Sequence, residues 1–141
     1  MGFFGKKHAK SDNCIIRPWE TAPHKGIAHY HGTCDSNGFY VYDFSVINDL
    51  RLNTPVTLEA VAADVFLRDD KGEQHKFTEN DWGIVYSLDG RLVGVAKARK
   101  EKVMKLLKDG YTVRMDAIVS YDKYLKFKTL LLGYSDLEIT E

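Results

Sequence analysis

Apolar and polar residues alternate along much of the chain, most clearly in residues 84–95. Two runs rich in β-branched and aromatic residues flank Asp89-Gly90, a pair that tolerates the positive φ angles of a type I′ turn. This pattern predicts a β-hairpin with a two-residue loop, which also sets the pairing of its strands. The predicted pairs are Tyr86 with Val93 and Ile84 with Val95, and these four side chains are predicted to share the core face.

The spacing of apolar residues changes after this hairpin. Val103, Leu106 and Leu107 are spaced i, i+3, i+4, which is the spacing of one helix face, and Gly110 suits the position after a helix C-terminus. Residues 97–108 contain six Lys or Arg and one Glu, a local charge of +5 (6 − 1). The pattern predicts the main helix at about 97–109, and its basic side is either an ordinary solvated face or a surface for phosphates.

Further strands are predicted where alternation is bounded by turn residues. Phe39–Ile47 is placed with the side that includes Tyr40 facing inward, because that side is continuously apolar. Residues 54–67 fit either a long strand that leads into a hairpin, which we favour, or a helix. The remaining predicted strands are Cys14–Ile16, Ile27–His31, Glu73–Phe77, Tyr111–Val119 and Tyr124–Leu132.

These elements indicate one α+β domain that is mostly antiparallel β. We expect its sheet to curl into a barrel or half-barrel, with the main helix across an opening. A chain of 141 residues is long enough for one domain with a real core and too short for two ordinary ones. We expect a flexible leader at residues 1–13, the domain at residues 14–134 and a loose acidic tail at residues 135–141.

Composition narrows the function only a little. The 20 basic and 20 acidic side chains cancel, so the chain has no overall charge that would favour nucleic acid. No run approaches the roughly 20 apolar residues of a membrane span, and the N-terminal apolar run is too short for a secretory signal. We therefore expect a cytoplasmic protein with reduced thiols and no membrane partner. No phosphate-binding glycine loop or catalytic motif stands out, so neither an enzymatic activity nor a cofactor is expected.

Cysteine and histidine residues gather in residues 14–34. Thiolate and imidazole are ligands that suit zinc, although the spacing here matches no common zinc motif. The alternatives are a polar pocket lined by histidines, or residues scattered over the surface. If a metal binds, the predicted ligands are Cys14, His29, His31 and Cys34.

Several residues have the chemistry to bind single-stranded nucleic acid, in which cations contact phosphates and aromatic rings stack on bases. Trp82 and Tyr124 are the candidate stacking residues, although a core position is the simpler explanation for Trp82. Lys126 and Lys128 form either a basic face beside Tyr124 or, as we prefer, the wet side of an edge strand. The candidate phosphate contacts are Arg91, Lys97, Arg99 and Lys100.

The stretch 80–119 resembles the HIRAN family. The resemblance covers at most residues 52–133, and it implies a small OB-like β-barrel that binds single-stranded DNA, notably at a 3′ end. Lys97 falls where the family often has a basic residue, whereas Glu79-Asn80-Asp81-Trp82 stands where the family has the Tyr-Asp pair that reads the DNA end. The matching motifs are Gly83-Ile84-Val85, Arg91-Leu92-Val93-Gly94, Val103-Met104-x-Leu106-Leu107, Asp109-Gly110 and the strand Tyr111–Val119.

Three functions are therefore considered. The first is a non-catalytic, HIRAN-like module that binds single-stranded nucleic acid. The second is a module of the same fold that binds a protein partner or itself, for example through the edge of Phe39–Ile47. The third is a metal-binding protein that uses the Cys14–Cys34 region.

Overall fold

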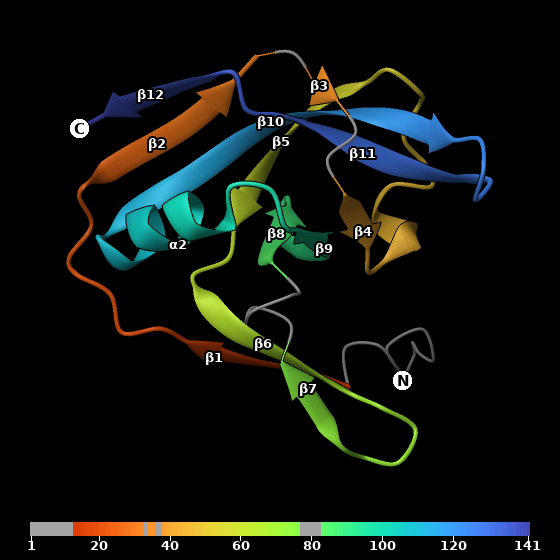
Figure 1. Ribbon diagram of the computed structural model, residues 1–141, viewed down its shortest axis with the longest axis horizontal. Helices are drawn as coiled ribbons and strands as arrows, with labels where there is room; N and C mark the ends of the chain where they lie inside the picture. Colours follow the sequence, from red (N-terminus) through yellow and green to blue (C-terminus); the bar gives the residue numbers. More distant parts are fainter. Residues whose placement is uncertain (1–12, 33, 36–37, 77–82) are drawn as a thin grey trace.

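Strands dominate the computed structural model (Figure 1), which describes residues 13–32, 34–35, 38–76 and 83–141. A single α-helix lies among these residues. The elements, in chain order, are β1 (Cys14–Pro18), β2 (Gly26–His31), β3 (Cys34–Asp35), β4 (Phe39–Val41), the 3₁₀ helix η2 (Phe44–Val46), β5 (Pro55–Ala60), β6 (Ala63–Arg68), β7 (Gln74–Lys76), β8 (Ile84–Leu88), β9 (Arg91–Ala96), α2 (Lys100–Lys108), β10 (Tyr111–Asp122), β11 (Phe127–Gly133) and β12 (Asp136–Thr140).

The strands within the described ranges form two sheets. The larger sheet follows the order β12-β2-β10-β5-β8-β9-β4, and β11 and β3 extend it from β10. The smaller sheet has the order β1-β6-β7. Most pairs are antiparallel, whereas β2 and β10 run parallel. The predicted α+β class, mostly antiparallel and with one main helix, is confirmed at this level.

The main core lies between α2 and one face of the large sheet. Val103 and Leu107 of α2 pack in the same buried cluster as Tyr30 of β2 and Met115 of β10. Figure 1 shows α2 lying over β10, the strand that it contacts most. Because successive side chains of a strand point to opposite faces, the residues between these core positions lie on the outer face of the sheet.

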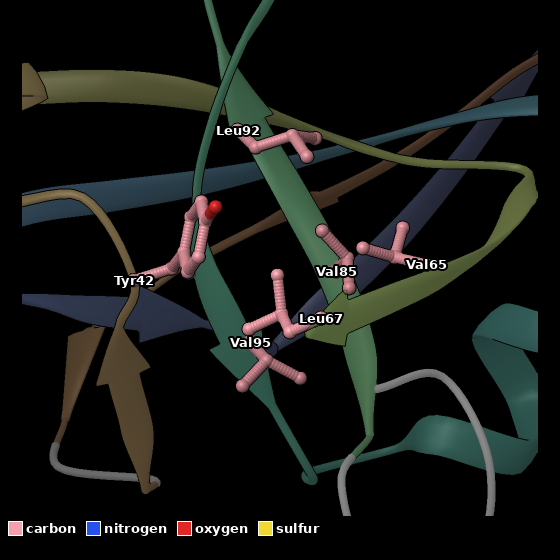
Figure 2. A pocket seen from close by; sticks show the side chains of 7 residues that line it. Tyr42, Val65, Leu67, Val85, Leu92 and Val95 are labelled. Atoms are coloured by element: carbon pink, nitrogen blue, oxygen red, sulfur yellow. The ribbon is translucent and has the colours of Figure 1, made fainter. Parts of the chain in front are cut away.

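A second, smaller core joins the two sheets. Val65 of β6 packs against Val85 of β8 and Val95 of β9. Figure 2 shows these side chains converging with Leu67, with Tyr42 to one side. They line a cavity of about 10 Å³. That volume is about enough for one water molecule, so this cavity cannot hold a substrate.

The central hairpin confirms the predicted turn and corrects the predicted register. Asp89 and Gly90 have φ values of 52° and 82°, the positive angles that a type I′ turn requires. A β-bulge follows Tyr86, so Tyr86 pairs with Gly94 and not with Val93. Ile84 pairs with Ala96, and the predicted pairing of Ile84 with Val95 is wrong for the same reason.

The predicted strand Phe39–Ile47 is wrong beyond its third residue. β4 ends at Val41, and η2 replaces the rest of the strand. The Asp43 carboxylate accepts hydrogen bonds from the Ser45 backbone amide and hydroxyl at 3.0 and 2.6 Å. Such local bonds offer the backbone an alternative to a sheet ladder, and they bend the chain here. Tyr40, predicted to face inward, is 55% exposed.

Other boundaries also differ from expectation. Residues 54–67 form neither a helix nor the favoured long strand, because β5 ends at Ala60 in the larger sheet and β6 begins at Ala63 in the smaller one. The predicted hairpin is formed by β6 and β7. The helix begins at Lys100, three residues later than predicted. The tail at 135–141, expected to be loose, contributes β12, which pairs with β2. The expected leader lies, apart from Asn13, outside the described residues.

Candidate functional site

A basic connection leads from β9 into α2. Within it, the Lys97 ammonium lies 5.9 Å from the ring centroid of Tyr40. Both residues are exposed, and Tyr40 belongs to β4, which pairs with β9 at one end of the large sheet. A cation at this distance from a ring face is attracted by the ring quadrupole. The structure thus places a predicted phosphate contact beside an exposed aromatic ring.

Arg99 is the N-cap residue of α2 and has a left-handed backbone, with φ of 53°. Its guanidinium lies 5.6 Å from the ring centroid of Tyr134. Burial raises the pKa of the nearby Tyr30 hydroxyl, and the positive charge of Arg99 partly offsets that rise. Arg99 is exposed, whereas Lys100, the first residue of α2, is half-buried.

The other predicted nucleic-acid contacts lie elsewhere. Arg91 begins β9, at the opposite end of that strand from Lys97, and it donates a hydrogen bond of 3.1 Å to the Ser45 hydroxyl. Tyr124 is 95% exposed on the turn between β10 and β11, at the far end of that hairpin from α2 (Figure 1). Trp82 lies outside the described residues.

A second candidate site lies on the outer face of the large sheet, opposite α2. His29 and His31 of β2 stack with ring centroids 4.0 Å apart. Asp116 of β10 contacts both rings: Oδ1 lies 2.9 Å from His29 Nε2, and Oδ2 lies 3.2 Å from His31 Nδ1. The sheet produces this cluster directly, because β2 and β10 are neighbours and their alternate side chains share a face.

Glu138 adds a fourth polar group from the other side of β2. It belongs to β12 and pairs in register with His29. Its Oε1 lies 3.2 Å from His31 Nε2, so both nitrogens of the His31 ring face a carboxylate. Three adjacent strands therefore contribute to the cluster.

An open groove of about 380 Å³ begins at this cluster. Arg114 lies in the groove with its Nε 3.5 Å from Glu59 Oε2, so its charge is largely compensated. The remaining charged side chain in the groove is that of Asp89, which is acidic. The groove therefore favours cations over phosphates. The residues that define its course are His29 of β2, Arg114 of β10, Thr57 and Glu59 of β5, Ser87 of β8 and Asp89 of the following turn.

The predicted metal ligands are brought together only in part. Among the residues whose side chains the structure describes, the group with metal-ligand spacing is His29, His31 and Asp116. Cys14 lies in β1 of the smaller sheet, where burial raises its thiol pKa and a hydrogen bond with Tyr42 partly offsets the rise. A raised pKa disfavours the thiolate, which is the form that binds metal or acts as a nucleophile. The Cys34 side chain lies outside the described part of the chain.

No local pattern in the sequence marks Asp116 or Glu138 as partners of the histidines. They lie 85 to 107 residues from His31 along the chain, and each looked like an ordinary polar position. They come together only because β2 lies next to both β10 and β12 in the sheet. That order cannot be read from local alternation.

Comparison with known proteins gives no relative, since no protein-family model, no curated protein and no solved structure matches this chain. The resemblance of residues 80–119 to the HIRAN family therefore stands on sequence motifs alone. Among the described helices, none has the length and apolar character needed to cross a bilayer. Side-chain geometry is therefore the basis for any functional assignment.

Proposed function

We propose that this protein is a non-catalytic module that binds single-stranded nucleic acid at the surface formed by Tyr40, Lys97 and Arg99. The observation that carries the proposal is the Lys97 ammonium above the exposed Tyr40 ring. Proteins that bind single strands combine cations that follow the phosphates with aromatic rings on which bases stack. Tyr40 offers a ring face for a base, Lys97 offers charge beside it, and Arg99 offers a second charge two residues further along the chain.

The start of α2 strengthens this surface. The N-terminus of a helix carries a partial positive charge and unpaired amides, which favour anions. Arg99, at the N-cap, makes no side-chain capping hydrogen bond. A phosphate that approaches Lys97 would therefore also meet the positive end of the helix. Lys100, which begins the helix, adds a further cation near this point.

An OB-like arrangement of the strands belongs to the same proposal. The position of α2 between the consecutive strands β9 and β10 supports it, because the HIRAN resemblance implies a helix between these two strands. Residues 79–82, which stand where that family has the Tyr-Asp pair that reads a 3′ end, are Glu-Asn-Asp-Trp and contain no such pair. We therefore propose binding that depends on the backbone charge and on stacking, and that ignores the end of the strand.

Titration of a labelled single-stranded oligonucleotide tests the proposal. We expect weak binding at low salt that declines as salt rises, because phosphate contacts release counterions. Removal of one such contact by Lys97→Met is expected to make the slope of log K against log salt less negative by about 0.7. Tyr40→Ala, which removes a stacking ring, is expected to cost about 1–3 kcal/mol of binding energy.

The matched control is Lys71→Met, which removes an exposed lysine on the turn before β7. Equal losses from Lys71→Met and Lys97→Met would show that any surface charge suffices and would contradict the proposed site. Oligonucleotides with a free or blocked 3′ hydroxyl are expected to bind equally. Absence of binding at low salt would overturn the proposal and favour the protein-interaction alternative.

A further inference from the structure

We infer that His29, His31 and Asp116 form a binding site for one divalent first-row transition metal ion, with Zn²⁺ as the reference ligand. The site lies on the outer face of the large sheet, whereas Lys97 and Tyr40 lie at the β4–β9 end near α2. The inference is therefore independent of nucleic-acid binding.

The distances within the cluster fit a shared ion. Zinc bonds of about 2.0–2.1 Å in a tetrahedral site place the ligand atoms about 3.3 Å apart. The Asp116 oxygens lie 2.9 and 3.2 Å from the facing nitrogens of His29 and His31. One ligand atom from each of the three residues lies within 4.8 Å of the other two. Small rotations of these side chains would therefore bring all three around one ion.

The hydrogen-bond geometry of His31 is compatible with a metal ion. A neutral imidazole carries one N–H, and its other nitrogen is an acceptor. Both nitrogens of His31 face carboxylate oxygens, Nδ1 at Asp116 and Nε2 at Glu138, each at 3.2 Å. One of these contacts then joins two acceptors, unless His31 gains a proton or a metal ion sits at Nδ1. A metal ion at Nδ1 leaves the proton on Nε2, where it donates to Glu138.

Glu138 would then act as a positioning residue. Histidines that bind metals commonly donate their second N–H to a carboxylate, which fixes the ring and its tautomer. Glu138 holds this place through Nε2 of His31. Its strand, β12, pairs along β2 from His31 to Ile27, so the carboxylate is positioned by the sheet. The cluster thus contains both the ligands and the group that would orient one of them.

The donor set selects the class of metal. Two imidazoles and one carboxylate suit Zn²⁺ and other first-row transition ions, whereas Mg²⁺ and Ca²⁺ prefer oxygen ligands. Three protein ligands leave a fourth position free, and His29 also lines the groove. We expect this fourth position to hold water that is accessible from the groove.

Metal titration of the full chain after chelator treatment tests the site. We expect one Zn²⁺ per chain by calorimetry, and a Co²⁺ complex without the charge-transfer absorption of a thiolate ligand. Glu138→Gln is expected to weaken binding about 10-fold, in line with the 10–100-fold effect of residues that orient ligands. His31→Gln and Asp116→Asn are expected to weaken it further, because each removes a ligand.

The matched control is His75→Gln. His75 Nε2 lies 2.8 Å from Asp69 Oδ2, so the two residues form a histidine–aspartate pair of similar length. Neither residue belongs to the proposed ligand group His29, His31 and Asp116. Its substitution is expected to leave metal affinity unchanged. Oligonucleotide binding is expected to be unchanged in His31→Gln and Asp116→Asn, which separates failure of this site from failure of the proposed function.

Three results would overturn the inference. The first is binding of Zn²⁺ and Co²⁺ by the wild-type chain with a dissociation constant above about 100 μM. The second is unchanged affinity in both His31→Gln and Asp116→Asn. The third is a thiolate absorption band of the Co²⁺ complex that is lost in Cys34→Ser, which would show that Cys34 is a metal ligand. Wild-type stoichiometry and spectra decide the question even if a variant does not fold.

Discussion

Tyr86 pairs with Gly94 across the β8–β9 hairpin because a β-bulge adds one residue to β9 after Leu92. The bulge turns Val95 away from the main core and toward Val85 and Val65, which form the smaller core. A regular hairpin would have placed Val95 on the same face as Ile84 and Tyr86. The bulge therefore allows side chains of one hairpin to pack in both the main core and the smaller core.

Gly94 is predicted to be essential for the position of β4. A Cβ at this residue would lie 2.4 Å from the Tyr40 carbonyl oxygen and 2.5 Å from Cζ of Phe39. Gly94→Ala must therefore displace β4, and we expect a loss of about 1–3 kcal/mol of stability, typical of overpacking. Urea denaturation measures this loss. Because β4 carries Tyr40, oligonucleotide affinity is expected to fall as well.

Gly90→Ala is the control for Gly94→Ala. No atom lies within 4 Å of a Cβ at Gly90, and its φ of 82° makes the cost one of backbone strain alone. We expect about 1 kcal/mol from that strain and no change in oligonucleotide affinity. A Gly94→Ala variant with the denaturation midpoint of the wild type would show that β4 is not held against β9 as described.

Asp43 is predicted to stabilise the turn that ends β4. Its carboxylate accepts two hydrogen bonds from Ser45 and lies 3.8 Å from Nη2 of Arg91. Asp43→Ala removes this cap, and we expect a loss of about 1 kcal/mol, as for other capping residues. Asp49→Ala, at an exposed carboxylate shortly after η2, is the comparison. Equal denaturation midpoints for the two variants would argue against the capping role.

Local chemistry explains which parts of the fold the sequence could predict. The Asp89-Gly90 turn follows from the angles its residues tolerate, and α2 follows from the spacing of Val103 and Leu107. The strand at Tyr111–Val119 follows from strict alternation over a buried face. Each of these depends on residues close together in the chain.

Other parts depend on contacts that local patterns do not encode. Phe39–Ile47 has the alternation of a strand, yet Asp43 and Ser45 bend it into η2. The acidic tail becomes β12 because β2 offers a free edge for pairing. The candidate metal site has the same origin: His29 and His31 were predicted as ligands, but Asp116 reaches them only through the parallel pairing of β2 with β10. The predicted partner Cys14 was separated from them by its place in the smaller sheet.

Two lysines are predicted to have opposite roles. Lys128 donates hydrogen bonds to the backbone carbonyls of Asn48, at 2.8 Å, and of Leu50, so it holds the loop before β5. Lys128→Met is expected to lose about 1–3 kcal/mol of stability and to keep wild-type oligonucleotide affinity. Lys97→Met is expected to show the reverse, with lower affinity and near-normal stability. Denaturation and oligonucleotide titration of both variants test this, and a loss of affinity in Lys128→Met would assign the basic surface to β11 instead.

The pKa of Cys14 predicts a decline in stability at alkaline pH. Burial raises the pKa of this thiol, and the hydrogen bond with Tyr42 only partly offsets the rise. Below the ordinary thiol pKa of about 8.5, the folded and unfolded chains are both protonated at this group, so its contribution does not change with pH. Above that pH the unfolded chain loses the proton first, which favours unfolding, until the pH passes the raised pKa of the folded state.

Cys14→Ala isolates this contribution. We expect the urea midpoint of the wild type to fall between about pH 8.5 and the raised pKa more steeply than that of Cys14→Ala, because only the wild type has this proton linkage. Alkylation of Cys14 in the folded chain at neutral pH is expected to be slower than in urea, since the reactive thiolate is disfavoured. Parallel pH profiles for the two proteins, or equal alkylation rates in the folded and unfolded chains, would contradict the raised pKa. They would also return Cys14 to consideration as a thiolate ligand or nucleophile.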